Sequence, residues 1–278
     1  MNFGYLIFVK TSDNADYIKL AYTLAMSIKL TQPEGYNAVA LAIDDLSELK
    51  NVKSPWVFDE VYEVSLFSGW DNRSLMYDIS PWEYTVCLDA DMLFTRDISH
   101  IIKYYASLYD IGLPGQVYNY KGVVADDSYF RKAQKQNNFP SVYTLFSFFK
   151  KCQDNENFFD LVKNITENQE PYKNLFLEKF KPQVLGTDEI FGLASYLLDY
   201  SIIFKDDYIK VLHMKGQIQG WPGSESRVSN RVGFYIDVDT EIKIGTYKQN
   251  SIVHYVEKDL ITDEIVSLYE NKMWELDV

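Results

Sequence analysis

Two carboxylates separated by one residue interrupt an apolar run over residues 85–94. Asp89 and Asp91 follow residues 84–88, whose composition is that of a buried strand. Because side chains alternate between the two faces of a strand, both acids can lie on the same side. A buried carboxylate normally pairs with or coordinates a cation, and oxygen ligands suit Mg²⁺ or Mn²⁺. A bare Asp-x-Asp is common, so the spacing alone favours a strand end that carries two solvated acids. The apolar residues on both sides strengthen the case for a divalent-cation site, and the rest of the chain decides between the two.

The elements around this pair place it at one edge of a predicted sheet. Short apolar runs predict three further strands: residues 5–9, 38–43 and 57–64. Helical periodicity predicts three helices: residues 17–28, 74–79 and 98–107. The first of these helices has three possible capping residues: Asp13, Asn14 and Asp16. The alternation predicts an α/β fold with a mainly parallel sheet, in which ligands collect at the carboxyl ends of strands. The two acids follow such an end.

The pattern becomes looser after residue 115. Residues 117–138 are expected to form loops over the sheet. Later segments predict four helices and one strand: helices at 143–151, 157–166, 189–198 and 260–270, and a strand at 252–256. Residues 210–226 contain several glycines and are typical of an ordered functional loop or a lid. Because no linker or repeat is recognisable, we expect a single domain over residues 1–278, with halves at 1–115 and 116–278.

Composition limits the classes of function. The chain has 278 residues, with 40 acidic against 27 basic side chains and a net charge of −13. This balance argues against general binding to nucleic acid, which requires a basic surface. The two cysteines, Cys87 and Cys152, have no metal-ligand spacing. No secretory signal and no stretch long enough to span a bilayer is recognisable, so we expect a cytoplasmic protein without a transmembrane segment.

Several motifs keep the order and approximate spacing of a known family. They are residues 11–17, 58–61, 73–75, 88–93, 186–189 and 253–255. Together they resemble retaining GT-A glycosyltransferases, the family that includes glycogenin and bacterial lipopolysaccharide glycosyltransferases. The resemblance implies a GT-A (Rossmann-like) mixed sheet flanked by helices. It also implies a metal-dependent hexosyl- or pentosyltransferase that moves a sugar from a nucleotide-sugar donor, a UDP-sugar, to an unidentified acceptor with retention.

The same resemblance implies roles for residues of the first half. Tyr17 would stack on the nucleotide base, with Thr11 and Asn14 near the nucleoside. A core-packed ring is an equally good interpretation of Tyr17. Arg73 would approach the donor phosphates or the sugar. Asp89 would hold the ribose or the metal, and Asp91 would bind Mn²⁺ or Mg²⁺ directly.

The family's third metal ligand is a late histidine in the pattern His-x-x-Gly-x-x-Lys, from which this chain departs. His213 keeps the glycine, but Gln219 replaces the lysine. His254 lies in the expected late strand, but no glycine follows, and the lysine comes early, at Lys258. We favour His254, because ligand histidines are commonly held on rigid elements, with His213 as the alternative. Lys215 would then contact the diphosphate or the acceptor, and Lys258 joins the donor-binding residues.

Two acids fall where the family has an Asp-Gln pair facing the donor sugar. Asp188 would bind sugar hydroxyls. Glu189, in place of glutamine, could stabilise an oxocarbenium-like transition state or act as a nucleophile. The simpler interpretation is that Thr187 or Asp188 only caps the helix that follows.

Two other classes of function remain open. A sugar nucleotidyltransferase would need a glycine-rich loop after the first strand, and residues 10–14 contain no glycine. A non-catalytic sugar- or nucleotide-binding protein would show no turnover. The acceptor is left open among glycans, proteins and other molecules, with nucleic acid disfavoured by charge.

Overall fold

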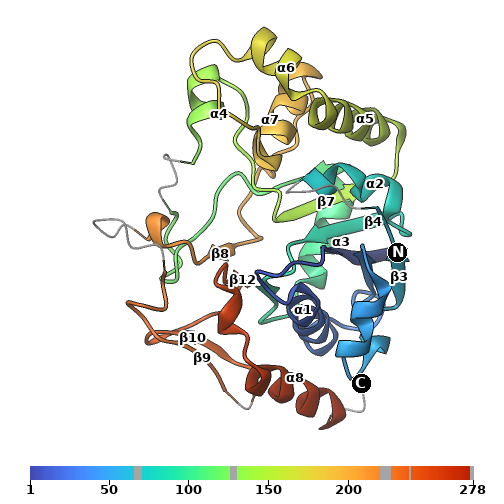
Figure 1. Cartoon of the computed structure of the whole chain (residues 1–278), viewed down its shortest axis with the longest axis vertical. Coiled ribbons are helices and arrows are strands. Elements are labelled where there is room, and N and C mark those ends of the chain that lie inside the picture. The colour runs from blue at the N-terminus through green and yellow to red at the C-terminus, as the bar shows by residue number, and fades with distance from the viewer. Residues whose placement is uncertain (66–70, 126–129, 220–226, 238, 276–278) are drawn as a thin grey trace.

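The computed structural model describes residues 1–65, 71–125, 130–219, 227–237 and 239–275. A six-stranded sheet in the order β3-β2-β1-β4-β7-β6 forms its centre (Figure 1). The strands are β1 (Phe3–Val9), β2 (Val39–Ile43), β3 (Glu60–Glu63), β4 (Tyr84–Leu88), β6 (Ile111–Gly112) and β7 (Phe146–Lys150). Strands β3, β2, β1 and β4 are parallel, while β7 is antiparallel to both of its neighbours. The predicted mixed, mainly parallel sheet is confirmed.

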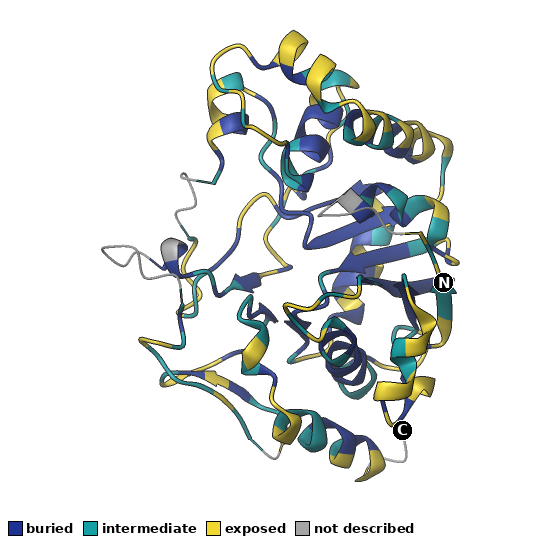
Figure 2. Ribbon diagram, in the orientation of Figure 1, coloured by how far each residue is buried: buried dark blue, intermediate teal, exposed yellow. Residues whose placement is uncertain are grey.

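Helices cover both faces of this sheet. They are α1 (Tyr17–Thr31), α2 (Met76–Ile79), α3 (Ser99–Leu108), α4 (Lys132–Asn137), α5 (Gln153–Glu167), α6 (Gln169–Phe176), α7 (Thr187–Leu197) and α8 (Asp263–Glu275). Alternate residues of β1 enter different clusters: Tyr5 and Ile7 pack with α1, α3 and α8, and Leu6 packs with α5 and α7. Buried residues therefore concentrate in the sheet and on the helix sides that face it (Figure 2).

The helix predicted over residues 143–151 is wrong. This segment forms β7, which pairs with β4 so that Phe146 lies opposite Leu88. A short apolar run buried on both faces carries no clear period, so periodicity alone cannot separate a strand from a helix. The loop predicted over residues 117–138 is also partly wrong, because α4 lies within it.

Two small sheets complete the chain. In the first, β12 (Ile252–His254) lies between β5 (Met92–Leu93) and β8 (Val211–His213). Strand β12 is antiparallel to β5 and parallel to β8. The second is an antiparallel meander of β9 (Phe234–Ile236), β10 (Ile242–Ile244) and β11 (Tyr247–Lys248), which we did not predict.

The pairing of β5 with β12 brings the late part of the chain to the Asp89–Asp91 segment. β7, from the second half, likewise lies within the main sheet. The division into halves at residue 115 stays a prediction. The loop predicted over residues 210–226 contains β8 and a 3₁₀ helix, Gly216–Ile218, and its last part, residues 220–226, lies outside the described residues.

Helix α1 begins at the edge of the sheet where β1 ends. Of the three capping candidates, Asp16 is the N-cap, and its side chain accepts a hydrogen bond of 2.9 Å from the Lys19 amide. No helix within the described ranges has both the length and the apolar composition needed to cross a membrane.

Candidate functional site

Asp89, Asp91 and His254 form a cluster at the carboxyl end of β4. Asp89 follows β4, Asp91 precedes β5, and His254 ends β12 opposite Met92. The His254 Nε2 atom lies 3.1 Å from Asp91 Oδ2 and 3.7 Å from Asp89 Oδ2. One ligand atom of each residue lies within 4.8 Å of the others. Two carboxylate oxygens and one imidazole nitrogen form a donor set compatible with a divalent cation such as Mn²⁺.

Each acid of the cluster also pairs with a cationic side chain. Arg73, on the 3₁₀ helix Asp71–Leu75, pairs with Asp89, and Lys258 pairs with Asp91. Asp91 is buried, at 5% exposed. Burial alone would raise the pKa of Asp91, but the adjacent His254 and Lys258 outweigh it and hold that pKa well below its usual range. Asp91 is therefore a carboxylate at neutral pH.

His213 stacks behind His254. The two residues are in register on parallel strands β8 and β12, and their ring centroids are 4.6 Å apart at an interplanar angle of 29°. Burial, and then the neighbouring His254 and Lys215, lowers the pKa of His213 well below its usual value, so His213 is neutral. The Nδ1 atom of each ring is buried without a hydrogen-bond partner within the part of the chain that is described. The structure thus places His254 beside the acids and His213 behind it, and the choice of metal ligand stays a prediction.

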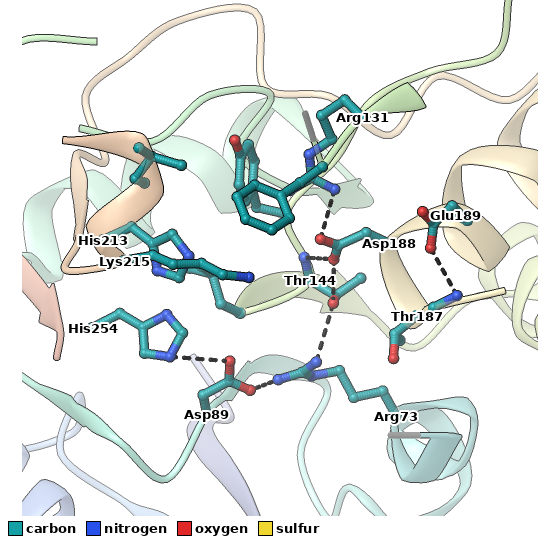
Figure 3. A pocket seen from close by; sticks show the side chains of 15 residues that line it. Arg73, Asp89, Arg131, Thr144, Thr187, Asp188, Glu189, His213, Lys215 and His254 are labelled. Atoms are coloured by element: carbon teal, nitrogen blue, oxygen red, sulfur yellow. Dashed lines mark hydrogen bonds and ion pairs between the residues drawn. The ribbon is translucent and has the colours of Figure 1, made fainter. Parts of the chain in front are cut away.

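A cavity of about 290 Å³ lies between this cluster and the start of α7. Among its lining residues are Arg73, Asp89, Arg131, Asp188, Lys215 and His254 (Figure 3). Charged side chains from five separate parts of the chain therefore face one space.

Asp188 is held at one end of this cavity by residues that the sequence did not reveal. Its Oδ1 atom accepts hydrogen bonds from Thr144 N at 2.8 Å and Thr144 Oγ1 at 2.7 Å, and its Oδ2 atom accepts one from Arg131 Nη1 at 2.7 Å. The guanidinium group of Arg131 also stacks on Tyr143, with its Cζ atom 3.8 Å from the centroid of the ring. Burial tends to raise the pKa of Asp188, but Arg131 and Thr144 outweigh burial and lower it.

Thr144 links the two ends of the cavity. Its hydroxyl donates to Asp188 and accepts a hydrogen bond of 3.1 Å from Arg73 Nη1, and Arg73 in turn pairs with Asp89 (Figure 3). Thr144 and Arg131 lie where no family motif is recognisable. A strand assignment for β7 would have been the available signal for Thr144, which lies two positions before the first residue of that strand, Phe146.

Glu189 lies at the start of α7, where its Oε2 atom accepts a hydrogen bond of 2.7 Å from Gly186 N. The N-cap residue is Gly186, and neither Thr187 nor Asp188 occupies the N-cap position. Burial, and then the charge of Asp188, raises the pKa of Glu189. Glu189 therefore satisfies a helix-end amide, and its catalytic role stays a prediction.

A second cavity, of about 420 Å³, lies at the carboxyl end of β1. Its lining includes Thr11, Asn14 and Tyr17, the residues predicted to bind the nucleoside. The Thr11 amide and hydroxyl donate to Asp44 Oδ1 at 2.8 and 2.9 Å. Asp44 follows β2 at the same edge of the sheet and was missed from the sequence. The Lys258 Nζ atom lies 6.0 Å from the Tyr17 ring centroid, so Lys258 lies between Tyr17 and Asp91.

Comparison with known proteins identifies the fold. No protein-family profile and no curated protein matches the sequence. Mouse xyloside xylosyltransferase 1 is similar in structure, with a TM-score of 0.51 and 12% identity over 78% of this chain and 89% of that protein. The bifunctional glycosyltransferase WbbM has a TM-score of 0.53 and 13% identity over 99% of this chain, and GlyE of Streptococcus pneumoniae has 0.50 and 11% over 100%. The chain spans 51% of WbbM and 64% of GlyE. At these identities the likeness establishes the fold, a mixed α/β GT-A fold that this chain shares with these glycosyltransferases.

Proposed function

We propose that the protein is a metal-dependent glycosyltransferase that moves a sugar from a UDP-sugar to an acceptor with retention at the anomeric carbon. One observation carries this proposal. The Asp89–Asp91–His254 cluster lies at the carboxyl end of β4, with a cavity on the Asp188 side and a second cavity at Tyr17. A nucleotide sugar bound in an extended form would need three adjacent sites: one for the nucleoside, one for the diphosphate and one for the sugar. The cavity at Tyr17, the acidic cluster and the cavity at Asp188 follow one another in this order.

The nucleoside end is assigned to the cavity at the end of β1. Tyr17 offers a ring face for the base, and Thr11 and Asn14 offer polar groups for the nucleoside. The choice of UDP rests on the family resemblance. A cytoplasmic location and the acceptor class stay predictions, and a xylosyltransferase among the similar structures keeps pentosyl as well as hexosyl donors within the proposal.

The diphosphate is assigned to the acidic cluster and its two cations. Asp89, Asp91 and His254 would hold Mn²⁺ or Mg²⁺, which when bound withdraws charge from the leaving diphosphate. Arg73 pairs with Asp89, and Lys258 pairs with Asp91. When the donor and the metal ion bind, Lys258 and Arg73 could each transfer their charge-assisted contacts to phosphate oxygens, because the metal ion would neutralise the two acids in their place.

The sugar is assigned to the cavity in front of Asp188. A carboxylate offers about four acceptor sites, and three on Asp188 are filled by Thr144 and Arg131. The remaining site, on Oδ2, can accept a sugar hydroxyl. Glu189 would stabilise positive charge at the anomeric carbon with the oxygen that does not bind Gly186.

The proposal is tested by donor turnover. The protein is incubated with Mn²⁺ and a panel of nucleotide sugars, and release of free nucleoside diphosphate is measured, with Asp91→Asn as the inactive control. We expect release from one UDP-sugar, and EDTA should abolish it. If no nucleotide sugar binds or is hydrolysed, the enzymatic proposal is wrong. Pyrophosphate release from a nucleoside triphosphate and a sugar 1-phosphate would instead identify a nucleotidyltransferase.

A further inference from the structure

The cavity of about 290 Å³ in front of Asp188, here called the sugar cavity, is also lined by Lys215. Within the described ranges Lys215 has no carboxylate partner. Of the other cations that line this cavity, Arg73 pairs with Asp89 and Arg131 with Asp188. The Lys215 side chain is half-buried, and its Nζ atom lies 3.7 Å from the centroid of the Phe130 ring. Burying an ammonium group without an anion is costly, so this position is suited to receive one from a ligand.

The backbone of Lys215 is held in place. Its carbonyl accepts hydrogen bonds from Ile218 N at 3.0 Å and from Gln219 Nε2 at 3.3 Å. The residue lies between β8 and the 3₁₀ helix Gly216–Ile218, and its side chain reaches into the cavity towards Thr144 and Asp188 (Figure 3). The ammonium group is therefore presented by an ordered segment.

Lys215 lines the same cavity as Arg73 and Asp89, and the charged groups that shift its pKa lie at the Asp188 end. The pKa of Lys215 is lowered, first by burial and then by the positive charge of Arg131, while Asp188 acts in the opposite direction. Its charged neighbours are thus those of the sugar end of the cavity. Glu189 also lines the cavity, and one of its carboxylate oxygens binds the Gly186 amide beyond Asp188 (Figure 3).

We infer that Lys215 binds a carboxylate carried by a sugar, so that the protein acts on a uronic acid. This inference rests on the proposed function. One ammonium group matches a single negative charge, and the free acceptor site of Asp188 matches a hydroxyl of the same sugar ring. A cavity of about 290 Å³ suits one sugar residue. The carboxylate belongs either to the sugar of the donor or to the acceptor.

The first arm of the test compares donors that differ only at C6. With Mn²⁺ present, binding of UDP-glucuronate is compared with UDP-glucose, and UDP-galacturonate with UDP-galactose, by calorimetry. A charge-assisted contact is expected to favour one uronate by about tenfold or more. Lys215→Met should remove the preference and leave binding of UDP alone unchanged, whereas Lys215→Arg should keep part of it. Circular dichroism and melting temperatures establish that both variants are folded.

The second arm tests an acceptor. The protein loaded with Mn²⁺ and UDP is titrated with methyl β-glucuronide and methyl β-glucoside. A preference for the glucuronide that depends on Lys215 places the carboxylate on the acceptor. Equal binding in both arms overturns the inference, as does a Lys215→Met variant that weakens UDP alone, because Lys215 would then serve the diphosphate. Failure of the wild-type protein to bind UDP at all would overturn the proposed function together with the inference.

Discussion

At the scale of single residues, Asp91 is the most constrained group of the site. It is buried, and it contacts both His254 and Lys258. His254 is fixed on β12, but Lys258 lies beyond the strand on a long flexible side chain. A metal ion bound at Asp91, as proposed, would therefore compete with the Lys258 ammonium, whereas His254 would add a ligand atom.

This competition predicts opposite effects of Lys258→Met on metal and on nucleotide. Affinity for Mn²⁺ alone should rise by roughly tenfold, because a charged competitor for Asp91 is removed. Affinity for UDP in saturating Mn²⁺ should fall, because a phosphate partner is lost. Both are measured by calorimetry or Mn²⁺ spectroscopy. Lys248→Met, which breaks a distant ion pair with Glu241, is the matched control, and a fall in affinity for Mn²⁺ alone would contradict the competition.

The two histidines predict different losses. His254→Ala should abolish metal-dependent donor hydrolysis, because it removes the nitrogen next to both acids. His213→Ala should retain hydrolysis, with metal affinity weakened by at most about 10–100-fold, as is usual for a residue that orients a ligand. Mn²⁺ binding and diphosphate release measure both. If His213→Ala abolished hydrolysis and His254→Ala retained it, His213 would be the metal ligand.

Residue types and spacing were sufficient to predict some of the site but not all of it. Asp89 and Asp91 stand out because acids are rare within apolar strands. Arg131 and Thr144 do not, because an isolated arginine or threonine in an irregular segment carries no local pattern. Their significance comes from Asp188, which lies 57 and 44 positions away along the chain.

At the scale of elements, the first turn of α7 combines a structural and a proposed chemical task. Gly186 leaves room for the Glu189 carboxylate, since a Cβ atom at position 186 would lie 2.6 Å from Glu189 Oε2. The same carboxylate lines the sugar cavity. A helix end thus fixes the direction in which Glu189 presents its second oxygen.

Glu189→Gln separates these two tasks. The pKa of Glu189 is raised in the folded state, so the wild-type protein loses stability as pH rises from about the unfolded value of 4.5 through the folded pKa. The Glu189→Gln variant does not lose stability in this way, because its side-chain amide does not ionise. Its melting temperature should therefore match the wild type near pH 4 and exceed it at pH 7–8.

The same variant should be slower. If Glu189 stabilises charge at the anomeric carbon, kcat for donor hydrolysis should fall by about 100-fold with unchanged donor affinity. A small loss of rate would limit Glu189 to capping α7.

The elements in the first part of the chain, where strands and helices alternate, were predicted well. Elements without local periodicity were not. Strand β4 was expected at residues 84–88 and is found there, and α1 begins at the predicted Tyr17. Residues 143–151 predict a helix where the structure has β7, because the aromatic residues of this strand are buried on both faces and carry no period of two. Strands β9, β10 and β11 are short and partly exposed, so no apolar run marks them.

At the scale of the whole molecule, the site lies where the main sheet and the small sheet of β5, β12 and β8 meet. The topology of the parallel half follows from the order of strands and helices along the chain. The position of β12 does not, because nothing local specifies its pairing with β5. The sequence accordingly favours His254 as the third candidate ligand but keeps His213 as an alternative.

Binding of metal and nucleotide should stabilise the entire fold. With Mn²⁺ and UDP at about 100 times the dissociation constant, linkage adds about 2.7 kcal/mol, which corresponds to a rise in melting temperature of roughly 5–8 °C. EDTA should remove the rise. Asp91→Asn should not show it, whereas Lys248→Met should. A melting temperature that does not rise when Mn²⁺ and UDP are added would contradict the site assignment.

The distance along the chain between Asp91 and its late partners has a consequence during biosynthesis. Lys258 follows Asp91 by 167 positions, which a ribosome translates in on the order of ten to thirty seconds. During that time the nascent chain already carries residues 11–17 and both acids, but neither His254 nor Lys258. Under the proposed function, the third candidate metal ligand joins the two acids only after β12 has been synthesised and pairs with β5.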